Sequence, residues 1–296
     1  MLQYFETLSA VAEAGSISRA AETLHISQPA VTRQIKAMEQ ELGAVLLTRT
    51  SHGVALTPVG RQVLVHAKQA LAAVAACRRV AAESSPGGPA RLSVAAGSML
   101  TQFVISPVMA AFKAARPELR VTLQTGHYQE CLDRLNSYEV DLALISTPMI
   151  PSGLKAKPIF TDPVVMVMPP GSPLAAAPNL GLADLEGMAL LVLPRAAGLR
   201  QQLTRILADA GINCQLTEHP SVETIKTMVA LDMGVTLLPR SAVVGEVALG
   251  RLAAVPLRDW PDHGRPVLAV TRSEGTLPEP VSAFLKALRD RYGTGV

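Results

Sequence analysis

The sequence contains few cysteines and few aromatic residues. Its three cysteines, Cys77, Cys131 and Cys214, are scattered and form no C-x-x-C pair. An odd number of isolated cysteines argues against a secreted fold held together by disulfides. Cys214 could sense redox but lacks a nearby partner, so a small apolar residue is the simpler interpretation of Cys77 and Cys214. Aromatic residues make up only 3% of the chain, so its cores must consist mainly of aliphatic side chains.

The chain also lacks the sequence features of export and membrane insertion. Its first residues, MLQYFETLSAVAEAG, contain two Glu but no Lys or Arg, so the basic segment of a signal peptide is missing. Polar residues interrupt every window of about 18 residues, the length that a transmembrane helix needs. We therefore expect a cytoplasmic protein with no membrane partner.

Catalytic motifs are missing as well. The chain has no G-x-S-x-G, Walker A, H-E-x-x-H or Rossmann fingerprint. Its six histidines are isolated from one another in the sequence. We therefore expect neither an enzyme nor a bound metal or cofactor.

What the chain does have is length and apolar content. With 296 residues, 49% of them hydrophobic, it is long enough for two or three domains with sizeable cores. The net charge of +3 is too small to indicate nucleic-acid binding by itself, so the distribution of charge has to decide. The run SSPGGP at 84–89 cannot continue a helix and marks a linker.

The residues before this linker predict three short helices, at 2–14, 18–24 and 28–42. Gly15 ends the first helix, and Ser16 or Ser18 caps the second. Ser27 caps the third helix, which ends at Gly43. The apolar face of that helix follows a helical spacing and consists of Val31, Ile35, Met38 and Leu42. Three short helices with a tight second turn are typical of a helix-turn-helix.

Two short strands and a long helix follow. Residues 46–49 and 54–56, separated by a turn with a Gly, predict a hairpin wing. A helix over about 58–83 then has small residues at alternating spacings of four and three, typical of a coiled-coil seam. This seam consists of Val63, Ala67, Ala70, Val74, Cys77 and Ala81. We predict a winged helix-turn-helix DNA-binding domain at 1–57, and a dimerisation helix with its linker at 58–89.

After the linker, β-like apolar runs alternate with helical patterns, which indicates an α/β fold with a parallel sheet. Strands are expected near 91–96, 119–125, 140–146, 163–168, 189–193, 214–218, 235–238, 252–257 and 266–271. Helices are expected near 100–115, 128–137, 199–211, 222–233 and 280–291.

Helix 28–42 presents a polar face opposite its apolar one. Gln28 and Arg33 can read base edges in a major groove, while Thr32 and Lys36 can hold phosphates. Further candidates for DNA binding lie at the second helix, the start of the third and the wing: Ser18, Arg19, Ser27, Pro29, Arg49, Thr50 and His52. An ordinary solvated face is the alternative for any one of them, so the prediction rests on their combination with the wing and the long helix.

Residues 5–60 resemble the DNA-binding segment of LysR-type transcriptional regulators. The clearest part of the resemblance is the run AEAGSISRAAETLHISQPAVTRQIK at 12–36. Leu47 and Thr48 depart from the family, which commonly has Phe-Glu or Phe-Asp there, and this departure affects the packing and charge of the wing. Looser resemblances continue at 162–174, 221–226 and 234–239.

Membership of this family implies an effector domain with the fold of a type II periplasmic binding protein. Such a domain has two α/β lobes with a ligand cleft between them. We expect it at 90–296, with lobe I at about 90–161 and 267–296 and lobe II at about 162–266. The family also implies binding to double-stranded DNA, a small-molecule effector and self-association into a homodimer and then a tetramer.

Ligands of open α/β sheets lie beyond the carboxyl ends of strands. The residues expected there or at the later landmarks are Ser98, Met99, Thr101, Gly126, His127, Ser146, Thr147, Arg195 and Thr224. Hydroxyls and helix N-termini favour a polar or anionic molecule, and Arg195 could pair with a carboxylate. Helix capping is the alternative for Ser98, Thr101 and Thr147.

Two other functions would fit part of this pattern. A solute-binding protein for transport would share the fold after residue 90, but the absence of a signal peptide and the helix-turn-helix argue against it. An enzyme with an added DNA-binding domain would need catalytic motifs. We therefore expect a regulator that binds an interrupted palindromic operator, with RNA polymerase as a further candidate partner.

Overall fold

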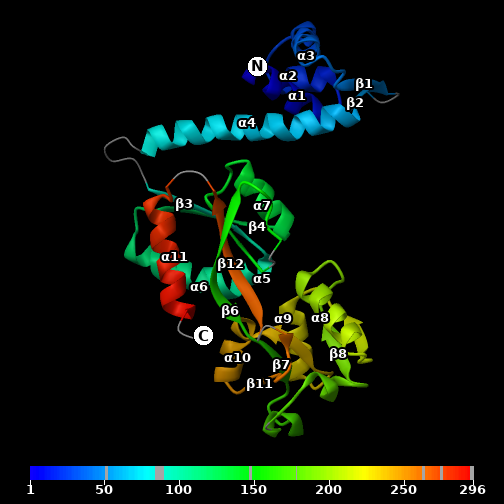
Figure 1. Cartoon of the computed structure of the whole chain (residues 1–296), viewed down its shortest axis with the longest axis vertical. Coiled ribbons are helices and arrows are strands. Elements are labelled where there is room, and N and C mark those ends of the chain that lie inside the picture. Colours follow the sequence, from blue (N-terminus) through cyan, green and yellow to red (C-terminus); the bar gives the residue numbers. More distant parts are fainter. Residues whose placement is uncertain are drawn as a thin grey trace. The chain divides into compact units, whose positions relative to one another are not determined.

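The computed structural model describes residues 1–50, 53–83, 90–146, 149–177, 179–261, 264–273 and 276–293 (Figure 1). Two predicted site residues, His52 and Thr147, and the predicted linker at 84–89 lie outside the described residues. Contacts divide the chain into two compact units. One contains residues 1–95, 118–122 and 132–141, and the other contains residues 96–117, 123–131 and 142–296.

Three helices open the chain: α1 (Leu2–Ala14), α2 (Ile17–Thr23) and α3 (Gln28–Leu42). As predicted, α1 and α3 each end at a glycine with left-handed backbone, Gly15 and Gly43, with φ of 62° and 65°. Ser16 rather than Ser18 caps α2, because its side chain accepts a hydrogen bond from the Arg19 N–H. Ser27 caps α3 in the same way, accepting from the Ala30 N–H at 3.3 Å.

The core of these helices is aliphatic. Leu8 and Val11 of α1 and Val31, Ile35 and Met38 of α3 are buried, joined by Ala20 and Ala21 of α2. The predicted apolar face of α3 is one turn too long, since Leu42 is 41% exposed. The helix ends at Gly43, so its last turn extends beyond the elements that cover the earlier turns.

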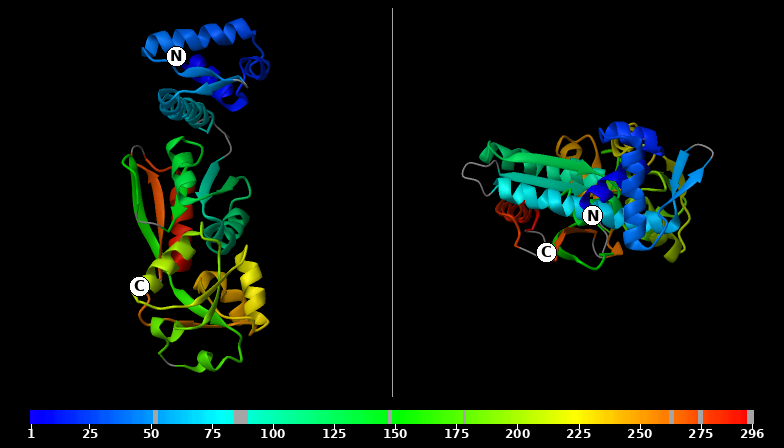
Figure 2. Two further views of the ribbon diagram at one scale, coloured as in Figure 1. Left: turned by 90° about the vertical axis from the view of Figure 1, so that its right-hand side faces the viewer. Right: turned by 90° about the horizontal axis from the view of Figure 1, so that it is seen from above.

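A hairpin and a long helix complete this part. The strands β1 (Leu47–Thr50) and β2 (Gly53–Leu56) pair antiparallel, and they extend from the helices in Figure 2. Helix α4 (Pro58–Glu83) follows at once. Ala67 is fully buried and Val63 joins the core of α1–α3, so the first part of the seam packs within its own chain. Cys77, further along, is exposed rather than packed.

The next part of the chain builds a five-stranded sheet in the order β4-β3-β5-β12-β6. Its strands are β3 (Arg91–Ala96), β4 (Arg120–Thr125), β5 (Leu142–Ile145), β6 (Leu154–Asp162) and β12 (Arg265–Arg272). The expectation of a parallel sheet is wrong for β12, which pairs antiparallel with both β5 and β6. Strand β6 was not predicted, because LKAKPIFTD mixes lysines and a proline with its apolar residues.

Helices cover this sheet. The helix after β3 runs without a break as α5 (Ser98–Leu100), a π-helical turn η1 (Thr101–Ile105) and α6 (Ser106–Ala115). The others are α7 (Tyr128–Asn136) and α11 (Glu279–Tyr292), and α6 and α11 lie beside the sheet in Figure 1. By length and composition alone, Ser98–Ala115 could cross a membrane. A single such helix is weak evidence for a span, and residues such as Val104 and Ile105 are buried in the fold.

The residues between β6 and β12 form a smaller α/β body. Its central sheet has the order β10-β7-β11, with both neighbours antiparallel to β7. The strands are β7 (Val164–Met168), β10 (Thr236–Pro239), β11 (Ala253–Pro256) and the parallel pair β8 (Ala189–Val192) and β9 (Gln215–Glu218). The helices are α8 (Gly198–Asp209), α9 (Val222–Ala230) and α10 (Val244–Ala248), with 3-10 turns η2 (Pro173–Ala176), η3 (Leu182–Leu185) and η4 (Arg240–Ala242).

Candidate DNA-binding surface and effector site

The two faces of α3 have different roles. Val31, Ile35 and Met38 are buried, whereas the predicted contact residues Gln28, Pro29, Thr32, Arg33 and Lys36 are all exposed. Across the described ranges, the side chains of Gln28, Thr32, Arg33 and Lys36 make no hydrogen bond or ion pair within the chain. Their polar groups are therefore available to an external ligand.

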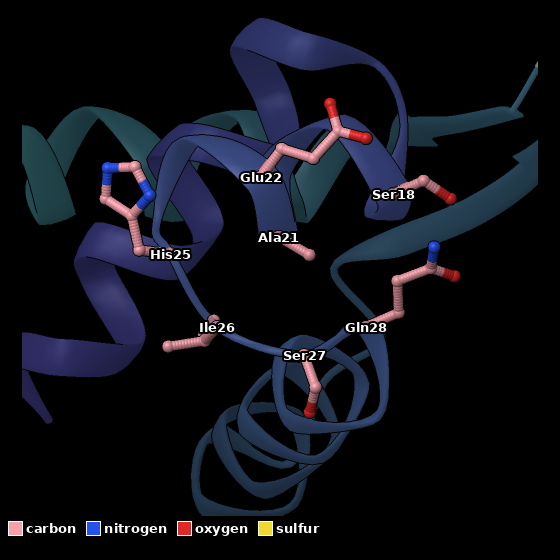
Figure 3. A pocket seen from close by; sticks show the side chains of 7 residues that line it. All are labelled: Ser18, Ala21, Glu22, His25, Ile26, Ser27 and Gln28. Atoms are coloured by element: carbon pink, nitrogen blue, oxygen red, sulfur yellow. The ribbon is translucent and has the colours of Figure 1, made fainter.

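A surface hollow marks the turn between α2 and α3. Its lining includes three of the predicted DNA-binding residues, Ser18, Ser27 and Gln28, together with Glu22 and His25. Figure 3 shows the side chains of Ser18 and Gln28 on the same side of this turn. The backbone of His25 in this turn is left-handed, with φ of 53°. The hydroxyl of Ser27 accepts the capping hydrogen bond of α3, which leaves its own O–H able to donate to a ligand at the helix start.

The wing and the second helix add further exposed side chains. Arg19, Arg49 and Thr50 are exposed, and Ser18 is half-buried. Arg49 and Thr50 stand at the end of β1, next to the turn of the hairpin. The basic residues predicted for DNA therefore come from three elements, α2, α3 and β1, of one compact unit.

Sequence patterns did not reveal what holds the wing in place. The carboxylate of Glu39 on α3 accepts hydrogen bonds from the backbone N–H groups of Leu46 and Leu47, at 2.7 and 3.2 Å. The Thr57 hydroxyl donates to the carbonyl of Val45 and accepts from the N–H of Gly60. A Cβ at Gly60 would overlap the carbonyl oxygen of Leu46. Helix α3, the wing and α4 are thus tied together through backbone groups.

Several predicted effector residues make hydrogen bonds within the chain, two of them at the starts of helices α7 and α9. The hydroxyl of Thr224 lies 3.0 Å from that of Ser221, which caps α9. The N–H of His127 donates to Glu130 of α7, and the N–H of Arg195 donates to Glu218. Ser98, His127 and Arg195 are exposed, while Gly126 is half-buried.

Two other predicted residues have buried hydroxyls without a partner. Thr101 Oγ1 and Ser146 Oγ are inaccessible to solvent and make no hydrogen bond within the described structure. The capping alternative therefore fails for Thr101, whose oxygen caps nothing. A buried polar atom without a partner costs about 1–3 kcal/mol, so these two oxygens mark positions where a ligand or water is expected.

A charged pair that the sequence did not indicate lies where β6 and β12 meet. Asp162 and Arg265 are opposite each other in the ladder. The carboxylate of Asp162 accepts from the hydroxyl and N–H of Ser241, at 2.6 and 3.2 Å. Burial raises the pKa of Asp162, although the Ser241 hydrogen bonds and the charges of Arg265 and Arg240 act against it. The guanidinium of Arg265 reaches the sulfur of Met99, a predicted effector residue, at 3.6 Å.

A second buried charge links the helix after β3 to α9. Lys226 is only 6% exposed and pairs with Glu223 and Glu246, at 2.9 and 2.6 Å. Its ammonium also lies 4.9 Å from the ring centre of Phe103 in η1. The neighbouring Gln102 donates to Glu223 at 3.1 Å. The π-helical turn thus contacts α9 through both of these side chains.

Two parts of the chain each match a family description. Residues 2–61 match "Bacterial regulatory helix-turn-helix protein, lysR family", and residues 86–293 match "LysR substrate binding domain". The chain belongs to the LysR family. It is a DNA-binding transcriptional regulator with an effector-binding domain, and its relatives are regulators rather than enzymes.

Individual relatives support the same assignment. The chain is 33% identical to a probable hydrogen peroxide-inducible genes activator of Mycobacterium avium, covering 89% of this chain and 85% of the relative. It is 31% identical to the transcriptional dual regulator GltC of Bacillus subtilis, over 81% and 80% of the two chains.

Solved structures show the same fold over the whole length. A full-length OxyR from Pseudomonas aeruginosa is 26% identical, with a TM-score of 0.74 over 98% of this chain and 94% of that one. A full-length CbnR in complex with its target DNA has a TM-score of 0.68 at 22% identity, over 98% and 99% of the two chains. The predicted winged helix-turn-helix and α/β effector domain are confirmed.

Proposed function

We propose that α3 reads its operator in the major groove and that its exposed residues divide the work. Gln28 and Arg33 specify bases, because an amide and a guanidinium can each make paired hydrogen bonds to base edges. Thr32 and Lys36 anchor phosphates, as do Ser18, Arg19, Arg49, Thr50 and His52. The observation that carries this proposal is that α3 buries one face and leaves the donors of the other without partners.

The experiment measures operator binding by the Arg33→Ala and Lys36→Ala proteins over a salt series. Losing a base contact should cost roughly 1–3 kcal/mol and relax preference at one base pair. Losing a phosphate contact should weaken all sequences alike and lower the salt slope by about one. If Arg33→Ala weakened every sequence equally while Lys36→Ala changed the base preference, the two roles would be reversed. Unchanged binding by both proteins would exclude α3 as the reading helix.

We also propose that the protein acts as a homodimer joined through α4, and that effector domains join dimers into a tetramer. The part of the seam beyond Ala67 supports this, because Ala70 and Val74 are only half-buried within one chain. A two-fold dimer reads paired half-sites, so the operator should be an interrupted palindrome. In this proposal the DNA-binding domain comprises residues 1–57, the dimerisation helix with its linker 58–89, and the effector domain 90–296. The protein acts in the cytoplasm, with RNA polymerase as a further partner.

The effector of this domain is, in our proposal, a small polar or anionic molecule held between lobe I and lobe II. The buried, unpartnered hydroxyls of Thr101 and Ser146 support it, because they are donors at predicted ligand positions. Ser98, Met99, Gly126, His127, Thr147, Arg195 and Thr224 complete the proposed surroundings.

Oxidation of Cys131 or Cys214 is a less suitable signal, although relatives are named activators of hydrogen peroxide-inducible genes. Peroxide-reactive cysteines need an accessible thiol with a low pKa. Cys131 is fully buried. Burial and the charge of Glu186 raise the pKa of the Cys214 thiol, which also donates to the carbonyl of Leu185. Reversible binding of a small molecule therefore fits these two sites better than their oxidation.

A further inference from the structure

Arg265 lacks an ion-pair partner within hydrogen-bond reach. It begins β12, and in the part of the chain that the structure describes its only hydrogen-bond acceptor is the thioether of Met99, at 3.6 Å. A thioether is a weak acceptor, whereas a guanidinium has five N–H donors and keeps its charge in proteins. Most of the donor capacity of Arg265 is therefore unused.

The carboxylate of Asp162, opposite Arg265 in the ladder, does not satisfy this arginine. Asp162 attracts Arg265, but its oxygens are bound by the hydroxyl and N–H of Ser241. Burial lowers the pKa of the Arg265 guanidinium, which shows that its charged form is penalised by lost hydration. A cation with that penalty and a weak acceptor is suited to bind an anion from solution.

Among the described residues, an unpartnered donor follows the strand beside this arginine. Ser146 directly follows β5, which pairs antiparallel with β12, so Ser146 and Arg265 lie toward the same end of neighbouring strands. Thr101 lies in the same continuous helix as Met99, the residue that Arg265 touches, but side chains two residues apart on a helix point to different sides. The hydroxyls of Ser146 and Thr101 are both buried without a partner in the described structure. Among the described residues, one cation and one unpartnered hydroxyl thus lie toward the same end of neighbouring strands, on β12 and after the end of β5.

We infer that Arg265 binds a carboxylate group of the effector, with the hydroxyl of Ser146 as an additional donor and Met99 in contact with the ligand. A singly charged, planar group fits best, because the guanidinium matches a carboxylate with two parallel hydrogen bonds. The charge of nearby Asp162 would disfavour a doubly charged phosphate. This inference rests on the proposed effector function and names the chemical group that the effector carries.

The test uses the full-length protein and a panel of small organic carboxylates, each paired with its neutral amide, in calorimetry and thermal unfolding. Binding of a carboxylate but not its amide is expected. Arg265→Gln should weaken that binding about 10- to 100-fold. Arg265→Lys should recover only part of it, because an ammonium cannot match the paired geometry. Arg205→Gln changes an exposed arginine of α8 and should bind like the wild type.

Several results would overturn the inference. A carboxylate that bound Arg265→Gln with wild-type affinity would do so, as would equal binding of acid and amide, or a panel in which no carboxylate bound. Ser146→Ala separates this failure from failure of the proposed function. If a ligand were weakened by Ser146→Ala but not by Arg265→Gln, the effector site would stand without its carboxylate. If neither change mattered, both would be wrong. Should Arg265→Gln unfold, Arg265→Lys carries the test alone.

Discussion

The DNA-binding part and the effector part of this regulator keep their polar groups in different places. Among the described residues up to 83, Thr7 is the one buried polar residue, and the polar side chains predicted to meet DNA are exposed apart from the half-buried Ser18. The effector part buries Ser93, Asp162, Lys226 and Thr236 and contains unpartnered buried hydroxyls. The first part offers a fixed surface to DNA, whereas the second part holds polar groups whose energy depends on what binds them.

The two parts also fix their geometry by different means. In the winged helix, backbone groups approach closely at Gly60 and Leu46, and Glu39 binds two backbone N–H groups. In the effector part, buried charges join separate elements, as Lys226 joins η1, α9 and α10. Close backbone packing therefore fixes the geometry of the DNA-binding part, whereas buried charges join the elements of the effector part.

The largest effect is expected from a charge placed on the seam, in a region whose described residues include no buried charged side chain. Val74→Glu should abolish the dimer, because an unpaired charge at an apolar interface costs several kcal/mol. Sedimentation of the full-length protein measures it. The next residue of α4, Ala75, is exposed and lies off the predicted seam, so the control Ala75→Glu should remain dimeric. Unchanged size of the Val74→Glu protein would disprove the seam.

The next effect tests close packing in the winged helix. Gly60→Ala should destabilise the DNA-binding part by about 3 kcal/mol, because the new methyl group would overlap a backbone oxygen that cannot swing aside. Calorimetric unfolding and operator affinity both report it. Gly198→Ala, at the first residue of α8, meets no atom within 4 Å and should leave stability nearly unchanged. Equal effects of the two changes would contradict the assigned role of Gly60.

A smaller effect is expected from the buried lysine of the effector part. Lys226→Met keeps the aliphatic stem but leaves Glu223 and Glu246 without their cation, and should cost about 2 kcal/mol. The matched change Lys286→Met removes an exposed pair with Asp290 on α11 and should cost less than about 0.5 kcal/mol. Denaturant unfolding measures both. Similar values would mean that the burial of Lys226 adds nothing to stability.

The smallest effect is a pH dependence from Asp162. Because burial raises its pKa in the folded protein, the folded state binds this proton more tightly than the unfolded chain does. Its contribution to stability is therefore fully present below the unfolded pKa and lost as pH rises through the folded pKa. Asp162→Asn should flatten the pH dependence of unfolding over that window. Asp290→Asn, in an exposed ion pair, should leave it in place.

The sequence predicted the elements whose signals are local. Gly15, Ser27 and Gly43 mark helix ends through their own backbone and side chains, and the structure places the ends there. The exposed face of α3 followed from its helical spacing. Strand β6 was missed because pairing with β12, rather than its own composition, favours the extended conformation. The predicted direction of β12 was also wrong, because pairing partners far apart in the chain decide it.

The effector part shows the same limit at the level of single residues. Thr101 and Ser146 were predicted because hydroxyls at strand ends form a recognisable pattern, and their role in effector binding stays a prediction. Arg265 and Lys226 were not, since nothing next to them in the sequence indicates burial. Each acquires its role from residues far away in the chain, Met99 for one and Phe103 for the other.

The ladder between β6 and β12 constrains the order in which this protein folds. It pairs Asp162 with Arg265 and extends to Leu154 and Arg272, so everything from β7 to β11 lies within one chain loop that the ladder closes. Closing a long unstructured loop costs conformational entropy, and prior folding of its contents shortens the effective loop. Folding of the β7–β11 body should therefore precede closure of the ladder. That body is also the segment that a short turn could replace while β6 and β12 remain neighbours, so the large sheet could be produced without it.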